Sequence, residues 1–130
     1  MKRRSLRDES GQSMVEFALI VPVLCMILFG IIQFGILYNN YLMLADAARV
    51  GARKAAVSRQ AANPVALADA AVRSSASNLD QAKLGVFITA TAWAPGADVT
   101  VETRYPYKIS LLGKVVADGT LSSQTTERVE

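Results

Sequence analysis

A carboxylate stands at the edge of the most apolar part of this sequence. In the stretch GQSMVEF, residues 11–17, Glu16 follows Gln12 by four residues and directly precedes a long apolar run. Residues four apart share one face of a helix, so a positive charge at Gln12 would lie within reach of the Glu16 carboxylate. Such a partner would offset the cost of moving a carboxylate into hydrocarbon, which reaches about 3 kcal/mol at the bilayer centre. The alternative is a Glu16 side chain that simply stays solvated among lipid headgroups, and Glu16 alone does not decide between the two.

The residues around Glu16 offer a source for that positive charge. A short basic leader, then Gly11, then a glutamate five residues further on, then an apolar run: this combination resembles the type IV prepilin (class III) signal. The resemblance implies that a prepilin peptidase cuts between Gly11 and Gln12 on the cytoplasmic face and leaves the apolar segment in place. The mature chain would begin with an ammonium group on Gln12. That ammonium would pair with Glu16 of the same chain or, as pilin-like assemblies imply, with Glu16 of an adjacent subunit, where the pair would help to set the register.

The rest of the sequence offers little catalytic chemistry. The chain has no histidine, which removes the commonest general base and the commonest metal ligand. Its one cysteine, Cys25, lies inside the apolar run, and its serines have no evident base partner. Asp98, Glu102 and Asp118 lack the dense spacing of a calcium loop. We therefore expect no enzyme activity, no cofactor and no metal site, and the net charge of +3 is too small to indicate nucleic-acid binding.

Residues 17–38, which read FALIVPVLCMILFGIIQFGILY, predict a transmembrane helix. They carry no charge, and a helix of this length spans about 33 Å, close to the hydrocarbon thickness of about 30 Å. A buried core helix is the weaker interpretation, because so short a chain has too little material to surround it. A cleaved secretory signal is also weaker, because its apolar region usually has about 7–15 residues. The transmembrane residues of interest are Phe17, Pro22, Gly30 and Gly35. Pro22 can bend the helix. Gly30 and Gly35 either allow another helix to approach closely or have no effect on packing.

The helical pattern continues beyond Tyr38. Residues 39–59 contain no proline and many strong helix formers. Small residues recur in this segment at helical spacing, and Ala48, Gly51 and Ala52 are the candidates for close helix packing. Their partner would be the second helix of the same chain or, less simply, a helix of another subunit. Basic residues flank both ends of the apolar run, so the positive-inside rule favours a cytoplasmic N-terminus only mildly.

Asn63 and Pro64 predict the start of a second helix, because asparagine is a good N-cap and proline is favoured at the first helical position. We expect this helix to cover residues 64–79 and to fray at its serine-rich end.

After Gly85 the period of the sequence changes to that of strands. Residues 86–93 and 99–105 alternate and flank the turn signal Pro95-Gly96, so they predict a β-hairpin. We expect Pro106 to stop the second strand, residues 108–119 to form a loop with a helical turn, and residues 120–129 to form a weak third strand.

These elements predict an α+β, pilin-like fold. A long N-terminal transmembrane helix continues into a soluble part that holds a second short helix and a small three-stranded antiparallel sheet. The expected domains are a prepilin-type leader at 1–11, the transmembrane helix at 12–38 and an extracytoplasmic α+β domain at 39–130.

Three blocks of the sequence resemble the TadE-like family, the pseudopilins or minor pilins of tight-adherence (Flp-type) pilus systems. The most specific is GQSMVEFALIVPVLCMILFGIIQFG at 11–35; the others are AARVGARKAA at 47–56 and TLSSQTTERVE at 120–130. The resemblance implies a single-pass protein of the bacterial inner membrane, with its N-terminus cytoplasmic and its C-terminal domain outside, that assists pilus assembly. The implied partners are the prepilin peptidase, the major Flp pilin, a sister pseudopilin, the inner-membrane pilus platform and membrane lipid, with no nucleic acid.

The competing interpretation is a generic single-pass membrane-anchored protein with a small extracytoplasmic binding domain. The mature N-terminus separates the two, because only the pilin interpretation requires cleavage before Gln12.

Overall fold

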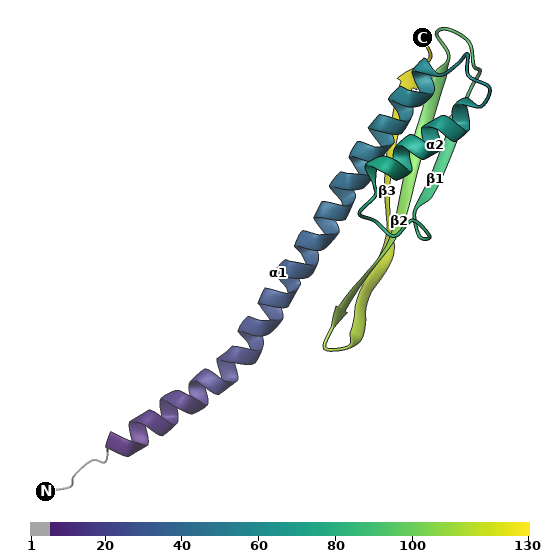
Figure 1. The fold of residues 1–130 in the computed structure, drawn as a ribbon. Coiled ribbons are helices and arrows are strands. Elements are labelled where there is room, and N and C mark those ends of the chain that lie inside the picture. The colour runs from purple at the N-terminus through teal and green to yellow at the C-terminus, as the bar shows by residue number, and fades with distance from the viewer. Residues whose placement is uncertain (1–5) are drawn as a thin grey trace, which may run out of the picture. The chain divides into compact units, whose positions relative to one another are not determined.

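The computed structural model describes the backbone of residues 6–130 and the side chains of residues 11–130. Two helices are followed by three strands (Figure 1), which confirms the predicted α+β fold class. The elements are α1 (Leu6–Val57), α2 (Pro64–Ser75), β1 (Gly85–Ala90), β2 (Asp98–Leu111) and β3 (Lys114–Arg128). The chain divides between Gly35 and Ile36 into two compact units, so each unit is described by itself. Most of the predicted leader, residues 1–10, lies outside the residues whose side chains are described.

The apolar span and its amphipathic continuation form one continuous helix, α1, and Pro22 lies inside it without ending it. The most apolar 18-residue window of this helix has none of its residues buried. The interpretation of this segment as a buried core helix is therefore wrong. Within the described residues, α1 is the one helix long and apolar enough to cross a membrane, which is compatible with a single-pass anchor.

The second unit contains an antiparallel sheet in the order β1-β2-β3, with each strand beside its neighbour in sequence. The predicted β1–β2 hairpin is confirmed, with Ala90 opposite Val99. Val99, Val101 and Thr103 are buried on one face of β2, as their alternation with polar residues predicts. On this face β2 meets both helices, because Val101 packs in one cluster with residues of α1 and α2.

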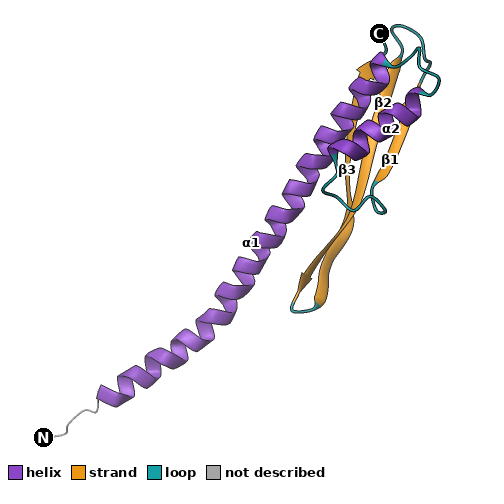
Figure 2. Cartoon of the chain, viewed as in Figure 1, coloured by secondary structure: helices purple, strands orange, loops and turns teal. Residues whose placement is uncertain are grey.

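The prediction that Pro106 stops the second strand is wrong, and so is the prediction of a loop at residues 108–119. β2 continues through Pro106 to Leu111 and pairs with β3 along this length, which makes a two-stranded ribbon that extends beyond the end of β1 (Figure 2). β1 begins at Gly85, opposite Arg104, so the part of β2 beyond Arg104 has an open edge within the described sheet. A proline is tolerated on an open edge, where its missing N–H removes no ladder hydrogen bond.

The α2 helix begins as predicted. The Asn63 Oδ1 atom accepts a hydrogen bond from the Ala66 backbone N–H at 3.0 Å, and Pro64 occupies the first turn. The helix ends at Ser75, four residues before the predicted end, which agrees with the expected fraying of the serine-rich segment.

The end of β3 closes the core against the end of α1. Val129 is 2% exposed and packs with Ala55, Ala56 and Val99. Its backbone N–H donates to the Ala97 carbonyl at 2.7 Å, and the Glu130 N–H donates to the Ala56 carbonyl at 3.1 Å. The last described residues are therefore part of the packed structure.

Candidate functional site

The predicted cleavage site lies on the exposed N-terminal part of α1. Gly11 and Gln12 are both exposed and both helical. A side chain at position 11 would meet no heavy atom of the described chain within 4 Å, outside the helix's own neighbouring backbone. Packing among the residues with described side chains therefore does not require glycine at this position.

Gln12 and Glu16 contact each other across one helical turn. The Gln12 Nε2 atom donates a hydrogen bond to the Glu16 Oε1 atom at 3.2 Å, and both side chains are exposed. The structure thus places the Glu16 carboxylate beside the residue that the prepilin resemblance makes the new N-terminus.

The predicted transmembrane residues lie on the uncovered part of α1. Phe17 is 67% exposed. Neither Gly30 nor Gly35 has a neighbouring atom within 4 Å of an added Cβ. Within the described chain these two glycines are therefore not required for packing.

The three helix-packing candidates lie inside the chain's own core. Ala48 and Ala52 are fully buried, and Gly51 is buried between them. A Cβ on Gly51 would clash with the Val72 side chain of α2 and would lie 3.3 Å from Val101 Cγ1 of β2. At position 51 α1 therefore lies close to both α2 and β2, and these three residues are covered by the chain's own elements.

The outer face of the sheet holds a small charged cluster. Arg104 Nε donates to Glu102 Oε1 at 2.7 Å, and the Arg104 guanidinium lies 4.8 Å from the centre of the Phe87 ring. The hydrogen bond from Arg104 is the main cause that holds the pKa of the Glu102 carboxyl below its ordinary value; desolvation opposes it with a smaller effect, and the positive charge of Arg104 adds a still smaller lowering. Both groups are solvent-accessible, and the cluster has no feature of a catalytic site.

The three carboxylates considered for calcium do not come together. Asp98 lies 3.9 Å from Arg128, Glu102 is bonded to Arg104, and Asp118 lies opposite Lys108 in the β2–β3 register. Among the residues with described side chains, no three His, Cys, Asp or Glu residues are grouped so as to hold a metal ion.

Sequence analysis missed one feature, a hollow of about 450 Å³ beside the open edge of β2. It is lined by Lys83, Tyr105, Pro106 and Lys108. The two lysines give it a positive character. Its sequence signal was the run YPYK at 105–108, which we had interpreted as the end of a strand.

Comparison with known proteins gives one match. The family model described as TadE-like protein matches residues 11–53, which comprise the apolar part of α1 and the beginning of its small-residue stripe. No curated protein and no solved structure matches the chain. The resemblance predicted from the opening residues is thereby confirmed for residues 11–53, which match the TadE-like model.

Proposed function

We propose that this protein is a minor pilin or pseudopilin, processed by a prepilin peptidase between Gly11 and Gln12, that takes part in assembly of a tight-adherence (Flp type IVb) pilus. α1 would anchor it in the bacterial inner membrane, with its N-terminus cytoplasmic and its C-terminal domain outside. The observation that carries the proposal is the contact between Gln12 and Glu16 at the charged edge of an exposed apolar helix, within the segment that matches the TadE-like model.

The position of Gly11 suits cleavage. A peptidase must reach the backbone between residues 11 and 12, and glycine presents that backbone without a covering side chain. Glycine also weakens a helix by about 1 kcal/mol relative to alanine, so α1 opens more readily here than at its neighbours.

Cleavage would change the electrostatics of α1 at one end. The new N-terminus would place an ammonium group where the helix dipole is already positive, which is unfavourable. A carboxylate in the first turns of the helix offsets both charges, and Glu16 is the acidic residue within reach. Near hydrocarbon, where water is scarce, this offset matters more than on an exposed surface. In an assembly the same carboxylate can accept the ammonium of a neighbouring subunit and thereby fix the relative position of the two chains.

The decisive experiment is to determine the N-terminus of the mature chain by mass spectrometry, in cells with a working pilus locus and in cells that lack the prepilin peptidase. We expect Gln12 as the first residue in the former and the full leader in the latter. Gly11→Leu should retain the leader in both, and because position 11 contacts nothing in the described chain, this effect would not reflect misfolding. An intact leader in cells that assemble pili normally would refute processing and favour the generic membrane anchor.

A further inference from the structure

The turn of the β2–β3 hairpin exposes an unusual amount of apolar surface. We define the hairpin tip as residues 109–117, which read ISLLGKVVA. Leu112 is 85% exposed, Val116 61% and Val115 55%. The tip contains one charged residue, Lys114, and no acidic one. Such a cluster of exposed aliphatic side chains at the end of a ribbon marks a contact with something outside the chain.

The backbone conformation of the turn is unfavourable for a leucine at position 112. Leu112 and Gly113 both have positive φ, 49° and 80°, as in the tight two-residue turns of β-hairpins. Asparagine, aspartate and glycine are the residues that favour the first position, whereas leucine is disfavoured there. Leu112 is thus unfavourable for the turn and unfavourable for exposure to water. An apolar environment would remove the cost of exposure, and the gain would offset the backbone cost of leucine at positive φ.

Within the second unit, β2 runs toward the end of α1 that holds Tyr38. Val99 of β2 packs near Ala55 and Ala56, whereas the Thr103 hydroxyl, four residues later, donates to the Leu44 carbonyl at 3.1 Å. β2 therefore runs antiparallel to α1 and continues in the direction of Tyr38. From Thr103 to Leu112 a strand covers about 30 Å, whereas from Leu44 back to Tyr38 a helix covers about 9 Å. The hairpin is therefore long enough to reach the surface of a membrane that α1 enters at Tyr38 even when it is strongly inclined to α1, whereas a hairpin parallel to α1 would pass Tyr38 by about 20 Å.

The tyrosines of the chain occur at this same end of the second unit. The sequence has four tyrosines, and they are Tyr38 and Tyr41 on α1 and Tyr105 and Tyr107 on β2. Tyrosine is enriched at the membrane–water interface, where its ring lies in the headgroup region and its hydroxyl remains hydrated. Two separate elements therefore carry tyrosines near Tyr38, of which Tyr105 also packs against the core and accepts a hydrogen bond from the Asp80 N–H.

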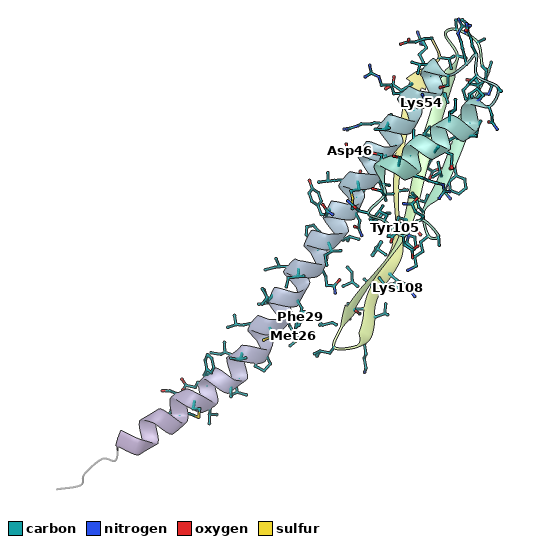
Figure 3. The ribbon with its side chains drawn as sticks, in the orientation of Figure 1. Met26, Phe29, Asp46, Lys54, Tyr105 and Lys108 are labelled. Atoms are coloured by element: carbon teal, nitrogen blue, oxygen red, sulfur yellow. The ribbon has the colours of Figure 1, made fainter. Side chains whose placement is uncertain are left out.

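Positive charge accompanies these aromatic residues. Between Glu102 and Asp118 every charged residue is a cation: Arg104, Lys108 and Lys114. Tyr105 and Lys108 succeed one another along the hairpin (Figure 3), and both line the hollow that also contains Lys83. Lysines above an apolar tip can direct their ammonium groups to lipid phosphates while their methylene chains cover apolar surface.

We propose that the hairpin tip inserts into the outer surface of an anionic phospholipid membrane. Leu112, Val115 and Val116 enter the boundary between headgroups and acyl chains, and Lys108 and Lys114 bind the phosphates. The inference rests on the proposed function in that α1 spans the membrane with the C-terminal unit outside. It adds a second attachment point that fixes the orientation of the C-terminal unit on the membrane, and this attachment has to be released when a subunit moves into a fibre.

The test uses the full chain in lipid vesicles. Cys25→Ser removes the native thiol, and Leu112→Cys introduces a single site for an environment-sensitive fluorophore. Ala94→Cys, in the exposed loop at the opposite end of the sheet, is the matched control. The vesicles contain phosphatidylcholine with or without phosphatidylglycerol, and a nitroxide on the lipid acyl chain serves as the quencher. We expect a blue shift and a loss of emission at position 112 but not at position 94, with the larger effect in phosphatidylglycerol.

Further arms separate the explanations. Lys108→Glu with Lys114→Glu should abolish the dependence on phosphatidylglycerol. Leu112→Asn suits the turn and so preserves folding, and it should reduce quenching of a fluorophore placed by Val116→Cys. Equal emission at positions 112 and 94 would overturn the proposal. A blue shift at position 112 that disappears when the protein is diluted with lipid would also overturn it, because the tip would then contact a second copy of the chain. A fluorophore on native Cys25 reports whether α1 lies in the membrane. Quenching at Cys25 without quenching at position 112 would refute insertion of the hairpin tip alone. No quenching at Cys25 would refute the membrane anchor and, with it, the insertion of the tip.

Discussion

Glu16 is the side chain on which the proposed function depends most at the scale of single residues. Glu16→Ala should leave cleavage before Gln12 largely intact, because it changes no atom of the cleaved peptide bond. It should weaken incorporation into the pilus, because the new ammonium group would lose its carboxylate. The measurements are the mass of the mature chain and its amount in sheared fibres.

The control for Glu16 is another exposed carboxylate on the same helix. Asp46 lies 3.5 Å from Arg49 in an exposed ion pair, and such pairs contribute little to stability. Asp46→Ala should therefore leave piliation unchanged. Normal piliation by the Glu16→Ala variant would count against the pairing role.

Gly51 is required by packing rather than by backbone conformation. An added Cβ would overlap the Val72 side chain, so Gly51→Ala should destabilise the chain by about 1–3 kcal/mol, the usual range for an overfilled core. Gly35→Ala is the matched control on the same helix, because it meets no neighbouring atom. The thermal unfolding midpoints of both variants in detergent check this prediction, and equal midpoints would contradict it.

The pair formed by Glu102 and Arg104 should be visible in a titration. Arg104 keeps the pKa of the Glu102 carboxyl lower in the folded chain than in the unfolded chain. The stabilisation that the pair supplies is therefore fully present above the unfolded-state pKa and is lost as the pH falls through the folded-state pKa. Carbon NMR of the Glu102 carboxyl should show the lowered pKa, and Arg104→Gln should raise it toward the ordinary value. An identical titration curve in both chains would show that Arg104 is not the cause.

Among the elements, α2 depends on its first turn. The Asn63 cap satisfies the Ala66 N–H, and the loss of such a cap costs about 1 kcal/mol. Asn63→Ala should lower the unfolding midpoint accordingly, whereas Asn78→Ala, exposed beyond the end of the helix, should not. A chemical denaturation series distinguishes them, and the prediction fails if Asn63→Ala matches the parent chain.

The elements that could be predicted from the sequence are those with strong local signals. The apolar run of α1, the Asn-Pro start of α2 and the alternation in β2 each identified their element. The β2–β3 hairpin was missed because Leu112-Gly113 is not a common turn pair, and because Pro106 is acceptable only in the part of β2 that has no β1 residue beside it.

The candidate site shows the same limit. Gln12 and Glu16 are four residues apart, so their contact follows from helical geometry alone. The constraint on Gly51 comes from Val72 and Val101, which are distant in sequence, and no local pattern at position 51 indicates them.

At the scale of the whole molecule, the buried hydrophobic side chains among the described residues all lie between Leu44 and Val129. The second unit should therefore fold without the apolar part of α1. A chain beginning at Asn39 should be soluble and unfold cooperatively, as measured by circular dichroism on heating. A chain beginning at Ala48, which lacks the buried Leu44 and Ala47, should lose this transition. A gradual, non-cooperative change in the Asn39 chain would show that the second unit depends on the first.

The placement of Val129 has a consequence for the order of events during export. Val129 packs against Ala55 and Ala56 in the last turn of α1. Along the chain, α2 and all three strands lie between these alanines and Val129. With the proposed topology, the core cannot close until the residues around Val129 have been synthesised and carried across the bilayer. On that topology the C-terminal unit is completed as a late step of translocation, after α1 has entered the lipid, and a chain stalled before this point would be anchored, incompletely folded and open to envelope proteases.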